Sequence, residues 1–296
     1  MAVARPLIRI PEMRPPGGPS PREATVGALL EFLHQRDQVM VLTGAGLSTS
    51  SGIPAYRDND GQWQRRNPIL FHEFMASEVM RRRYWARSYF GWPQITQARP
   101  NAGHRALARL EEHGVLSGLV TQNVDGLHAR AGSNALIELH GSLAKVSCMD
   151  CGARFDRDEI QEDLSALNPD WSPKVLGFNP DGDAELDDKA YPGFRIADCS
   201  SCGGRLKPDV VFFGEPVPTA RAGGVGQMLT RSDGLLVVGS SLVVMSGLRI
   251  VRQAAAAGLP VVAVNMGRTR GDEFLSFKVS LDCVEVFEAV AEQFSR

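Results

Sequence analysis

Residues 39–48 read VMVLTGAGLS, an apolar run that stops at a turn of small and polar residues. A second run of the same kind, residues 118–120, leads into the polar stretch 121–128, TQNVDGLH. Such runs are typical of buried parallel strands, and open α/β sheets bind ligands at the carboxyl ends of their strands. Gly44 and Gly46 permit a tight turn with close backbone approach, and the N terminus of a following helix can bind a phosphate. The two runs therefore predict a nucleotide site.

The dehydrogenase form of such a site does not fit this sequence. The fingerprint of dehydrogenases requires a third glycine three residues after the second, where this chain has Thr49. No acidic residue stands at a strand end about twenty residues further on to hold a ribose. The chain instead continues as GIPAYRD over residues 52–58, a polar stretch that contains proline. We therefore expect a nucleotide-binding domain of another kind.

The cysteines predict a structural zinc site. Four of the five cysteines form two Cys-x-x-Cys pairs, Cys148 with Cys151 and Cys199 with Cys202, and a glycine follows each pair. Two such pairs on tight turns can complete a tetrahedral site with four thiolate ligands, which leaves no open position for water. The alternative is that these cysteines are redox-active or unligated. We expect one structural Zn²⁺, and we expect the fifth cysteine, Cys283, to pack near the last strand.

Composition limits the functional classes. The chain has 296 residues, of which 43% are hydrophobic, enough for a large core and a small additional module. A net charge of −2 predicts no nucleic-acid partner. The sequence contains no apolar run long enough for a membrane span, and its thiols favour a reducing compartment. We expect a monomer that does not associate with membranes.

The first 22 residues are expected to form a disordered tail. They contain four arginines and one acidic residue, Glu12, a balance found in organellar presequences. Six prolines would break the amphipathic helix that a presequence needs, so the stretch is a poor presequence. We expect a cytoplasmic protein if the source is bacterial, and a protein of the mitochondrial matrix if it is eukaryotic.

Helical and strand patterns alternate along most of the chain. The expected helices cover 26–32, 71–92, 106–110 and 254–257, and the expected strands cover 39–42, 118–121, 135–139, 210–213, 234–239, 259–264 and 284–287. A segment rich in proline, glycine and acidic residues, 156–198, interrupts the alternation. The sequence predicts an α/β fold, in which a Rossmann-like parallel sheet domain over 23–296 carries an inserted small zinc-binding module at about 142–206.

The motifs of this chain follow one another in the order found in sirtuins. They are GAGLS at 44–48, GIPAYRD at 52–58, TQNVDGLH at 121–128, His140-Gly141, the two cysteine pairs, KPDVVFFGE at 207–215 and GSSL at 239–242. The resemblance spans about residues 25–290. The long segment between the cysteine pairs, with YWAR at 84–87 and GWPQ at 91–94, is similar to class II sirtuins, a branch that includes the mitochondrial lipoamidase-type enzymes.

The resemblance implies an NAD-dependent protein-lysine deacylase, or deacetylase. Sirtuins transfer the acyl group from lysine to ADP-ribose and release nicotinamide, 2′-O-acyl-ADP-ribose and the free lysine. A base near the ribose hydroxyls assists this transfer, and a histidine with a pKa near 7 suits that role. An NAD-dependent protein ADP-ribosyltransferase of the same fold is the first alternative. A non-enzymatic binding protein built around the zinc module is the second.

The resemblance also assigns catalytic and cofactor-binding residues. His140 matches the catalytic base, and its place at a strand end, before a glycine that leaves room for a ligand, agrees with that role. Asn123 and Asp125 match catalytic residues of the nicotinamide pocket, although Asn and Asp after a strand often only form a turn. The expected NAD contacts are Gly44, Ala45, Gly46, Ser48, Ile53, Tyr56, Arg57, Gln122, Asn123, Asp125, Gly239, Ser240, Ser241, Asn265 and Cys283. His128 is expected to be structural.

The expected partners are acyl-lysine protein substrates, which sirtuins bind between two extended segments. The matching residues are Val211, Phe212, Phe213, Gly214 and Glu215 in one segment and Leu242 and Val243 in the other. Main-chain pairing of this kind binds a peptide with little sequence preference, so the resemblance does not identify particular target proteins.

Tyr84 and Arg87 are similar in position to a tyrosine and an arginine that bind the acyl carboxylate in desuccinylating sirtuins. On a helix their i, i+3 spacing puts both side chains on one face, and an arginine can hold a carboxylate with paired hydrogen bonds. The pair predicts activity on dicarboxylic acyl-lysines such as glutaryl-lysine. The alternative is that both residues only pack or pair internally.

Overall fold

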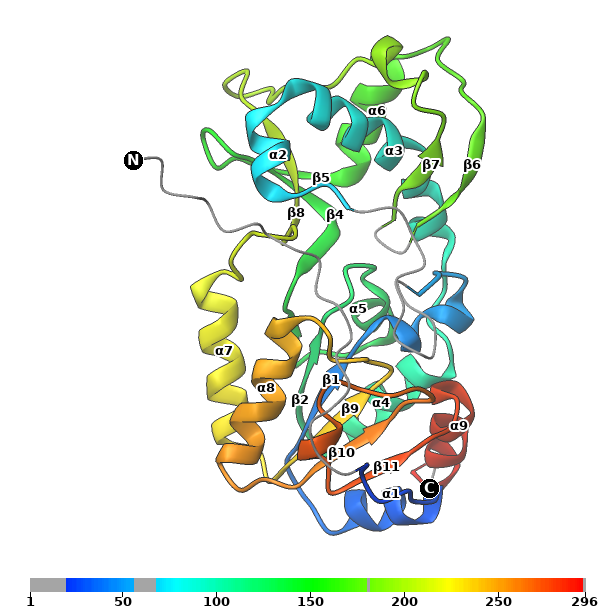
Figure 1. The fold of residues 1–296 in the computed structure, drawn as a ribbon, viewed down its shortest axis with the longest axis vertical. Coiled ribbons are helices and arrows are strands. Elements are labelled where there is room, and N and C mark those ends of the chain that lie inside the picture. Colours follow the sequence, from blue (N-terminus) through cyan, green and yellow to red (C-terminus); the bar gives the residue numbers. More distant parts are fainter. Residues whose placement is uncertain (1–19, 56–67, 180–181, 295–296) are drawn as a thin grey trace.

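The structure is a computed structural model, and it describes residues 20–55, 68–179 and 182–294. The chain forms two bodies that lie one above the other in Figure 1. The lower body contains the parallel sheet and both ends of the described chain. The upper body contains the cysteine pairs, and strands β4 (Gly141–Cys148) and β8 (Leu206–Val210) run between the two bodies.

The lower body is built on a six-stranded parallel sheet with the order β11-β10-β9-β1-β2-β3. Its strands are β1 (Val39–Thr43), β2 (Leu116–Thr121), β3 (Leu136–Glu138), β9 (Gly234–Val238), β10 (Val261–Val264) and β11 (Phe277–Val279). From β1 the sheet grows through β2 to β3 on one side and through β9 to β11 on the other. The order reverses between β1 and β9, and doubly wound sheets bind ligands at such a point. The predicted Rossmann-like α/β class is confirmed.

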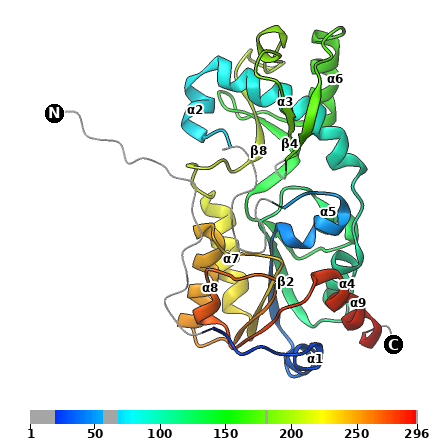
Figure 2. The same cartoon turned by 45° about the vertical axis from the view of Figure 1, so that its right-hand side comes forward.

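Helices cover both faces of this sheet, as the turned view of Figure 2 shows. One face carries α1 (Val26–His34), α4 (Ala102–Glu112) and α9 (Cys283–Gln293), and the other carries α7 (Thr219–Thr230) and α8 (Met245–Ala256). In β1, Val39 and Val41 belong to the first core, and Met40 and Leu42 belong to the second. Because both faces of β1 are buried, its first four residues are all apolar, and the buried Thr43 ends the strand.

The upper body combines the cysteine region with two helices from earlier in the chain. Besides β4 and β8 it contains α2 (Phe71–Ala76), α3 (Glu78–Gln97), β5 (Arg154–Asp156), α6 (Arg157–Leu167), β6 (Val175–Phe178) and β7 (Ala184–Leu186). One hydrophobic core joins Phe74 and Trp85 of α2 and α3 to Val146 and Leu164 of β4 and α6. The segment predicted as a module, 142–206, therefore packs together with α2 and α3, which lie outside the predicted boundaries.

The strand predicted at 284–287 is wrong, because these residues lie in α9. Val286, Phe287 and Val290 are buried at helical spacing, and the Asp282 side chain accepts hydrogen bonds from the first N–H groups of the helix. The last strand of the sheet is β11, which the predicted elements do not include. Valines two residues apart, at 284 and 286, imitate the alternation of a strand here.

The strand predicted at 210–213 is only partly correct. β8 ends at Val210, which is opposite Gly141 where β8 pairs with β4. Residues 211–213 continue as a loop toward the lower body. The helix expected at 71–92 is two helices, α2 and α3, separated by Ser77, whose side chain caps the start of α3. The remaining expected strands and helices are present, and α8 begins nine residues before the predicted helix start at 254.

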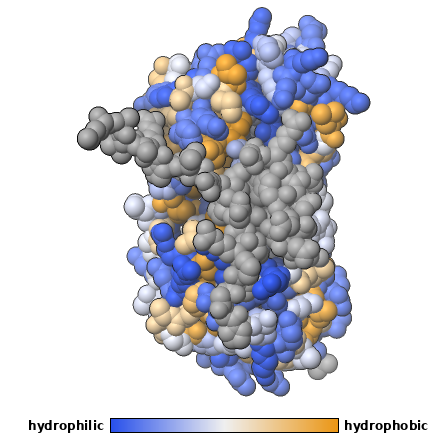
Figure 3. Space-filling model, in the orientation of Figure 1, coloured by the Kyte–Doolittle hydropathy of each residue, from blue (hydrophilic) through white to orange (hydrophobic). Residues whose placement is uncertain are grey.

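The surface is largely polar. Hydrophilic residues cover most of both ends of the face that Figure 3 shows. Exposed large apolar side chains are scattered over different elements, for example Val79 in α3 and Leu176 in β6. Within the part of the chain that the structure describes, no helix has the length and apolar character needed to span a membrane.

Candidate active site

A pocket of about 830 Å³ opens at the carboxyl ends of the parallel strands. It is lined by the residue that directly follows each of four neighbouring strands: Gly44 after β1, Gln122 after β2, Gly239 after β9 and Asn265 after β10. The reversal of strand order between β1 and β9 lies at its centre. The pocket therefore has the position of a ligand site in a doubly wound sheet.

Glycines let the loops after β1 and β9 approach each other closely. A Cβ atom at Gly44 or Gly46 would lie 2.8 or 2.9 Å from the carbonyl oxygen of Gly239, which is too close for van der Waals contact. The N–H of Gly46 donates to that same oxygen at 2.8 Å. After the glycines the chain forms two 3₁₀ turns, η1 (Ala45–Leu47) and η2 (Thr49–Ser51). The longer helix expected to present its N terminus to a phosphate is not formed here.

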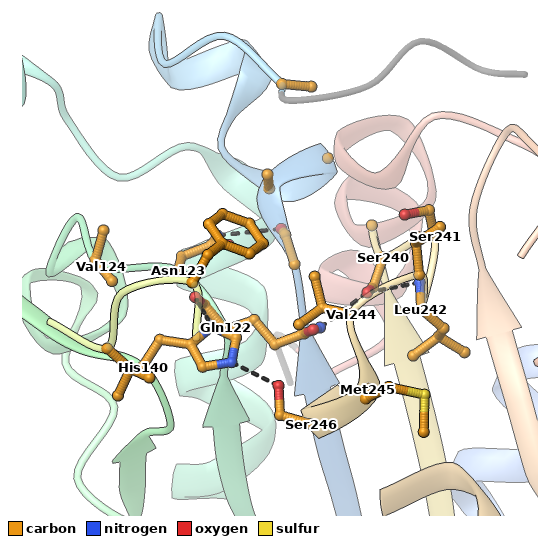
Figure 4. A pocket seen from close by; sticks show the side chains of 18 of the residues that line it. Gln122, Asn123, Val124, His140, Ser240, Ser241, Leu242, Val244, Met245 and Ser246 are labelled. Atoms are coloured by element: carbon orange, nitrogen blue, oxygen red, sulfur yellow. Dashed lines mark hydrogen bonds between the residues drawn. The ribbon is translucent and has the colours of Figure 1, made fainter. Parts of the chain in front are cut away.

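His140 lies in the pocket with both ring nitrogens hydrogen-bonded (Figure 4). Nδ1 lies 2.9 Å from the carbonyl oxygen of Gln122, and Nε2 lies 2.7 Å from Oγ of Ser246. A carbonyl oxygen only accepts, so in the neutral ring Nδ1 carries the proton and the Nε2 lone pair accepts from the Ser246 hydroxyl. The arrangement fixes both the tautomer and the orientation of the ring.

The environment keeps His140 uncharged. Burial lowers the pKa of its imidazole, the hydrogen bond to the Gln122 carbonyl opposes this effect, and the positive charge of Arg221 adds to it. A histidine with a lowered pKa is neutral at neutral pH and can accept a proton. The residue is therefore equipped to act as a general base.

The glycine after His140 is required by packing within the protein. Gly141 has φ of +85°, and a Cβ at this position would collide with the backbone carbonyl oxygen of Asp209 in β8. Just beyond, the N–H of Val211 donates to the His140 carbonyl at 2.8 Å. The expectation that this glycine leaves room for a ligand is therefore wrong, since it leaves room for the neighbouring strand.

Asn123, Ser48 and Asp125 form a chain of hydrogen bonds beside the pocket. Nδ2 of Asn123 donates to the Gly44 carbonyl and to Oγ of Ser48, both at 3.1 Å. The Ser48 hydroxyl in turn donates to Oδ2 of Asp125 at 2.8 Å, and Oδ1 accepts from the Leu127 N–H at 2.9 Å. Burial raises the pKa of Asp125, and the two hydrogen bonds oppose that effect. Asn123 lines the pocket, whereas Ser48 and Asp125 lie behind it.

Gln122 connects three loops of the site. Its Nε2 donates to the Thr43 carbonyl at 3.2 Å and to Oγ of Ser240 at 2.8 Å, while its backbone carbonyl holds His140. The ends of β1, β2 and β9 are therefore joined by one side chain, as Figure 4 shows in part.

Most of the expected NAD contacts share this pocket. Those that line it are Gly44, Ala45, Gly46, Gln122, Asn123, Gly239, Ser240, Ser241, Asn265 and Cys283. Ser48, Asp125 and Ile53 do not line it, and Ile53 packs beside Trp92 in a separate core. Tyr56 and Arg57 lie outside the described residues.

Cys283 is the first residue of α9, and it packs in the core beside Val279 of the last strand, β11, as expected. Its Sγ faces the Val264 carbonyl at 3.6 Å, and burial raises the pKa of the thiol to about 12. A thiol with such a high pKa stays protonated at neutral pH, so Cys283 is not a nucleophile.

Both segments expected to bind a peptide face the pocket. All five residues from Val211 to Glu215 line it, together with Leu242 and Val243. The Glu215 carboxylate accepts from the Phe212 N–H at 2.9 Å and pairs with Lys207 at 3.1 Å, so it holds its own turn in shape. Leu242 has φ of +55°, the only positive φ of a non-glycine residue in the described chain, and such strain costs on the order of 1–3 kcal/mol.

Tyr84 and Arg87 do not act on the pocket together. Tyr84 lines it beside Phe212, with ring centroids 5.3 Å apart. Arg87 does not line it, because its guanidinium lies 2.9 Å from the Asp183 carboxylate and donates to the Ala184 carbonyl at 3.1 Å. This geometry favours the alternative in which Arg87 pairs internally.

The four paired cysteines meet in the upper body. Their sulfur atoms all lie within 4.8 Å of one another. The Sγ atoms of Cys148 and Cys202 are 3.6 Å apart, and those of Cys151 and Cys199 are 3.8 Å apart. Zn–S bonds of about 2.3 Å in tetrahedral geometry place sulfur atoms about 3.8 Å apart, so the cluster fits a zinc ion.

Two polar residues of α8 that line the pocket were not predicted from the sequence. Ser246 and Arg249 line it from the first turns of α8, while Leu248 and Val251 of the same helix are buried. Residues three apart share a helix face, so both polar side chains lie on the face opposite the core. The sequence could have indicated them, because α8 directly follows the Gly239 loop and its first turns must therefore lie beside the pocket.

Comparison with known proteins agrees with this site. A model of the Sir2 family matches residues 44–246. An NAD-dependent protein deacetylase of Bordetella bronchiseptica is 50% identical over 269 residues, which cover 91% of this chain and 98% of the relative. One of Xanthomonas campestris pv. campestris is 52% identical over 258 residues, covering 87% of this chain and 88% of the relative.

Solved structures of Sir2 proteins are similar to this chain along most of its length. A Sir2 structure with a p53 peptide and NAD⁺ has a TM-score of 0.74 and 29% identity, covering 92% of this chain and 99% of the other. A Sir2 structure bound to an acetylated peptide has a TM-score of 0.72 and 27% identity, with the same coverage of both chains. Membership of class II, with its lipoamidase-type enzymes, stays a prediction. The chain belongs to the Sir2 family, the sirtuins.

Proposed function

We propose that this protein is an NAD-dependent protein-lysine deacetylase, or deacylase, that transfers the acyl group of lysine to ADP-ribose and releases nicotinamide. The observation that carries the proposal is that His140 lies in the same pocket as Asn123 and the Gly44 turn, where the strand order reverses. Burial lowers the pKa of His140, which favours the neutral form that a base needs. The names of the bacterial relatives support the same activity.

The loops at the strand ends suit a dinucleotide. The glycine turn at 44–46 brings backbone close to the centre of the site, where we assign the pyrophosphate. Ser240, Ser241 and Asn265 supply hydroxyl and amide groups for the phosphate and ribose oxygens. NAD, when bound, supplies the ribose carbon to which the acyl oxygen adds.

We assign His140 as the base that accepts a proton from a ribose hydroxyl at its Nε2 atom. Its Nδ1–H stays bonded to the Gln122 carbonyl, which stabilises the imidazolium that forms. Asn123 lines the nicotinamide end of the pocket in this assignment. Asp125 has an indirect role in this assignment: its carboxylate orients the Ser48 hydroxyl, which in turn holds the amide of Asn123.

We assign the acyl-lysine peptide to the opening between residues 211–215 and 242–243. Backbone pairing on both sides would bind peptides of varied sequence. Tyr84 and Phe212 then contact the acyl group with their rings. Because Arg87 is already paired with Asp183, it supports the fold in this proposal and leaves the acyl carboxylate to other groups.

The relatives are bacterial, and a zinc site of four thiolates requires reduced cysteines. Both observations support a protein that works in the bacterial cytoplasm.

A panel of acetyl-, glutaryl- and lipoyl-lysine peptides, incubated with and without NAD, tests the proposal. Mass spectrometry should show loss of the acyl group and appearance of acyl-ADP-ribose only when NAD is present. A target that instead gains ADP-ribose, with its acyl group retained, would favour the ADP-ribosyltransferase. No change in any peptide would contradict both activities.

A further inference from the structure

Ser246 contacts Nε2, the nitrogen of His140 that takes the proton, through its hydroxyl at 2.7 Å. Its hydroxyl comes from the second residue of α8, whereas His140 follows β3 on the other side of the pocket (Figure 4). We propose that Ser246 is the positioning residue of the base, which holds the His140 ring in one orientation before and after proton transfer. This inference rests on the proposed function, since it takes His140 to be the base.

The hydrogen-bonding capacities of the groups define what Ser246 does. In the neutral ring, Nδ1 donates to the Gln122 carbonyl, and Nε2 accepts from Ser246 Oγ at 2.7 Å. After His140 has taken a proton, Nε2 carries a hydrogen and can donate to the same oxygen, because a hydroxyl both donates and accepts. For the ribose proton to reach Nε2, the hydroxyl hydrogen of Ser246 first rotates off the Nε2 lone pair. Ser246 Oγ keeps its position and then accepts from the new Nε2–H.

The residue after Ser246 packs closely against Gln122. A Cβ at Gly247 would lie 2.5 Å from Oε1 of Gln122, so a larger residue here would displace the end of this side chain. Gln122 is the same residue whose backbone carbonyl holds Nδ1 of His140. The two hydrogen-bond partners of the ring, Ser246 and Gln122, therefore meet where α8 packs against the loop after β2.

The charges around the ring come from several elements. Arg221 of α7 lowers the pKa of His140, and Asp209 of β8 pairs with Arg221 at 3.3 Å. The surrounding elements also carry Glu138 at the end of β3, Asp125 after β2, Lys207 in β8, and Arg249 and Arg252 in α8. Since Ser246 is uncharged, its removal leaves these charges in place and changes only a hydrogen bond.

Removal of the hydroxyl should affect the protonated ring most. A hydrogen bond from a charged donor is stronger than one between neutral groups by about 1 kcal/mol, which corresponds to roughly half a pH unit or slightly more. In Ser246→Ala the acid limb of the kcat/KM profile should therefore move to lower pH by about that amount. The kcat on the plateau should fall about fivefold to tenfold, because the ring is less well oriented.

Three variants make the test specific. Ser246→Thr keeps a hydroxyl and should restore both the plateau and the position of the acid limb. Ser165→Ala is the matched control: Ser165 lies in α6 of the upper body, where its hydroxyl donates to the Gln161 carbonyl. This control should have the wild-type profile. A Ser246→Ala enzyme with a lower plateau but an unmoved acid limb would show that Ser246 is only structural, and would overturn the proposal.

A second readout does not depend on the reaction. Histidine ¹⁵N NMR of the whole protein without NAD reports the state of each ring nitrogen, and comparison with His140→Ala assigns the His140 signals. In Ser246→Ala the Nε2 resonance should move toward that of a lone pair that accepts no hydrogen bond, while Nδ1 stays protonated. An unchanged spectrum would overturn the proposal. If wild type removes no acyl group, the proposed function fails while this spectrum still decides the role of Ser246.

Discussion

The guanidinium of Arg87 lies 2.9 Å from the carboxylate of Asp183, and only 7% and 3% of these side chains are exposed. Asn179 also donates to this carboxylate, at 3.1 Å. The pair joins α3 to the chain just before β7, so it links two parts of the upper body. An arginine with a buried carboxylate partner is not available to bind a second carboxylate unless that pair is broken.

Arg87→Met should destabilise the protein. Loss of one member of a buried ion pair leaves the other charge without compensation, which costs about 3–5 kcal/mol. We expect a clear fall in the melting temperature, together with equal losses of activity on acetyl- and glutaryl-lysine peptides.

Arg83→Met is the control for this experiment. Arg83 pairs with Asp188 at the surface, where 32% and 66% of the side chains are exposed, and such pairs contribute about 1 kcal/mol or less. Its melting temperature should stay close to that of wild type. Selective loss of glutaryl-lysine activity in an Arg87→Met protein of normal stability would instead show that Arg87 binds the acyl carboxylate.

His140→Ala should abolish deacylation and leave the fold and most of the NAD affinity intact. We assign proton acceptance to the imidazole, and the dinucleotide contacts to the loops after β1, β9 and β10, which line the pocket. Turnover of an acetyl-lysine peptide and calorimetric binding of NAD measure the two effects separately. His113→Ala, an exposed histidine at the end of α4, should behave as wild type. Normal turnover by folded His140→Ala would refute the assignment.

Cys199→Ser should remove the zinc and unfold the upper body. Binding at a structural zinc site is worth on the order of 10 kcal/mol or more, comparable to the stability of a whole domain. Elemental analysis of untagged wild type should find one zinc per chain, and the variant should contain none and melt at a lower temperature. Cys283→Ala removes a cysteine outside the cluster and should keep the metal. A wild-type protein with much less than one zinc per chain would contradict the site.

Acid should destabilise the protein through its buried histidines. Burial lowers the pKa of His104 from 6.5 to about 4, and it also lowers the pKa values of His128 and His140. The unfolded chain binds protons at these histidines near pH 6.5, whereas the folded chain binds them only at lower pH. The free energy of unfolding is therefore highest above pH 6.5 and decreases as the pH falls below 6.5. For His104 alone the difference in pKa corresponds to about 3 kcal/mol.

Urea unfolding between about pH 7.5 and 4.5 measures this loss. His104→Gln removes the titrating ring and keeps a side chain that can complete the capping box with Asn101 at the start of α4. We expect the free energy of unfolding of this variant to fall less steeply with pH than that of wild type. His113→Gln, on the surface, should keep the wild-type slope. Equal slopes in all three proteins would rule out His104 as a source of the acid sensitivity.

Much of the site was predictable because its signals are local. An apolar run that ends in Gly44 or Gln122 marks the end of a buried strand, and parallel strands bring such ends to one edge of a sheet. The cysteine pairs are local in the same sense, since each pair presents two ligands from one turn. The residue types and their spacing are therefore enough to predict both the ligand site at the strand ends and the metal site.

The helix at 283–293 shows where local reading fails. Val284 and Val286 alternate as in a strand, but Phe287 and Val290 complete a helical stripe that packs on α4 and α1. Over so few residues the two periods are not distinguishable, and the choice depends on which surface is present to be covered.

The sequence by itself determined that a parallel sheet carries a polar site at its strand ends, and that four cysteines form a metal cluster. Only the tertiary structure decided that Arg87 pairs with Asp183, 96 residues away, and that His140 meets Ser246, 106 residues away. The physical reason is that a buried polar group must find a partner within about 3 Å, whatever its distance along the chain. Spacing in the sequence fixes which side chains share an element, and packing of elements fixes which of them touch.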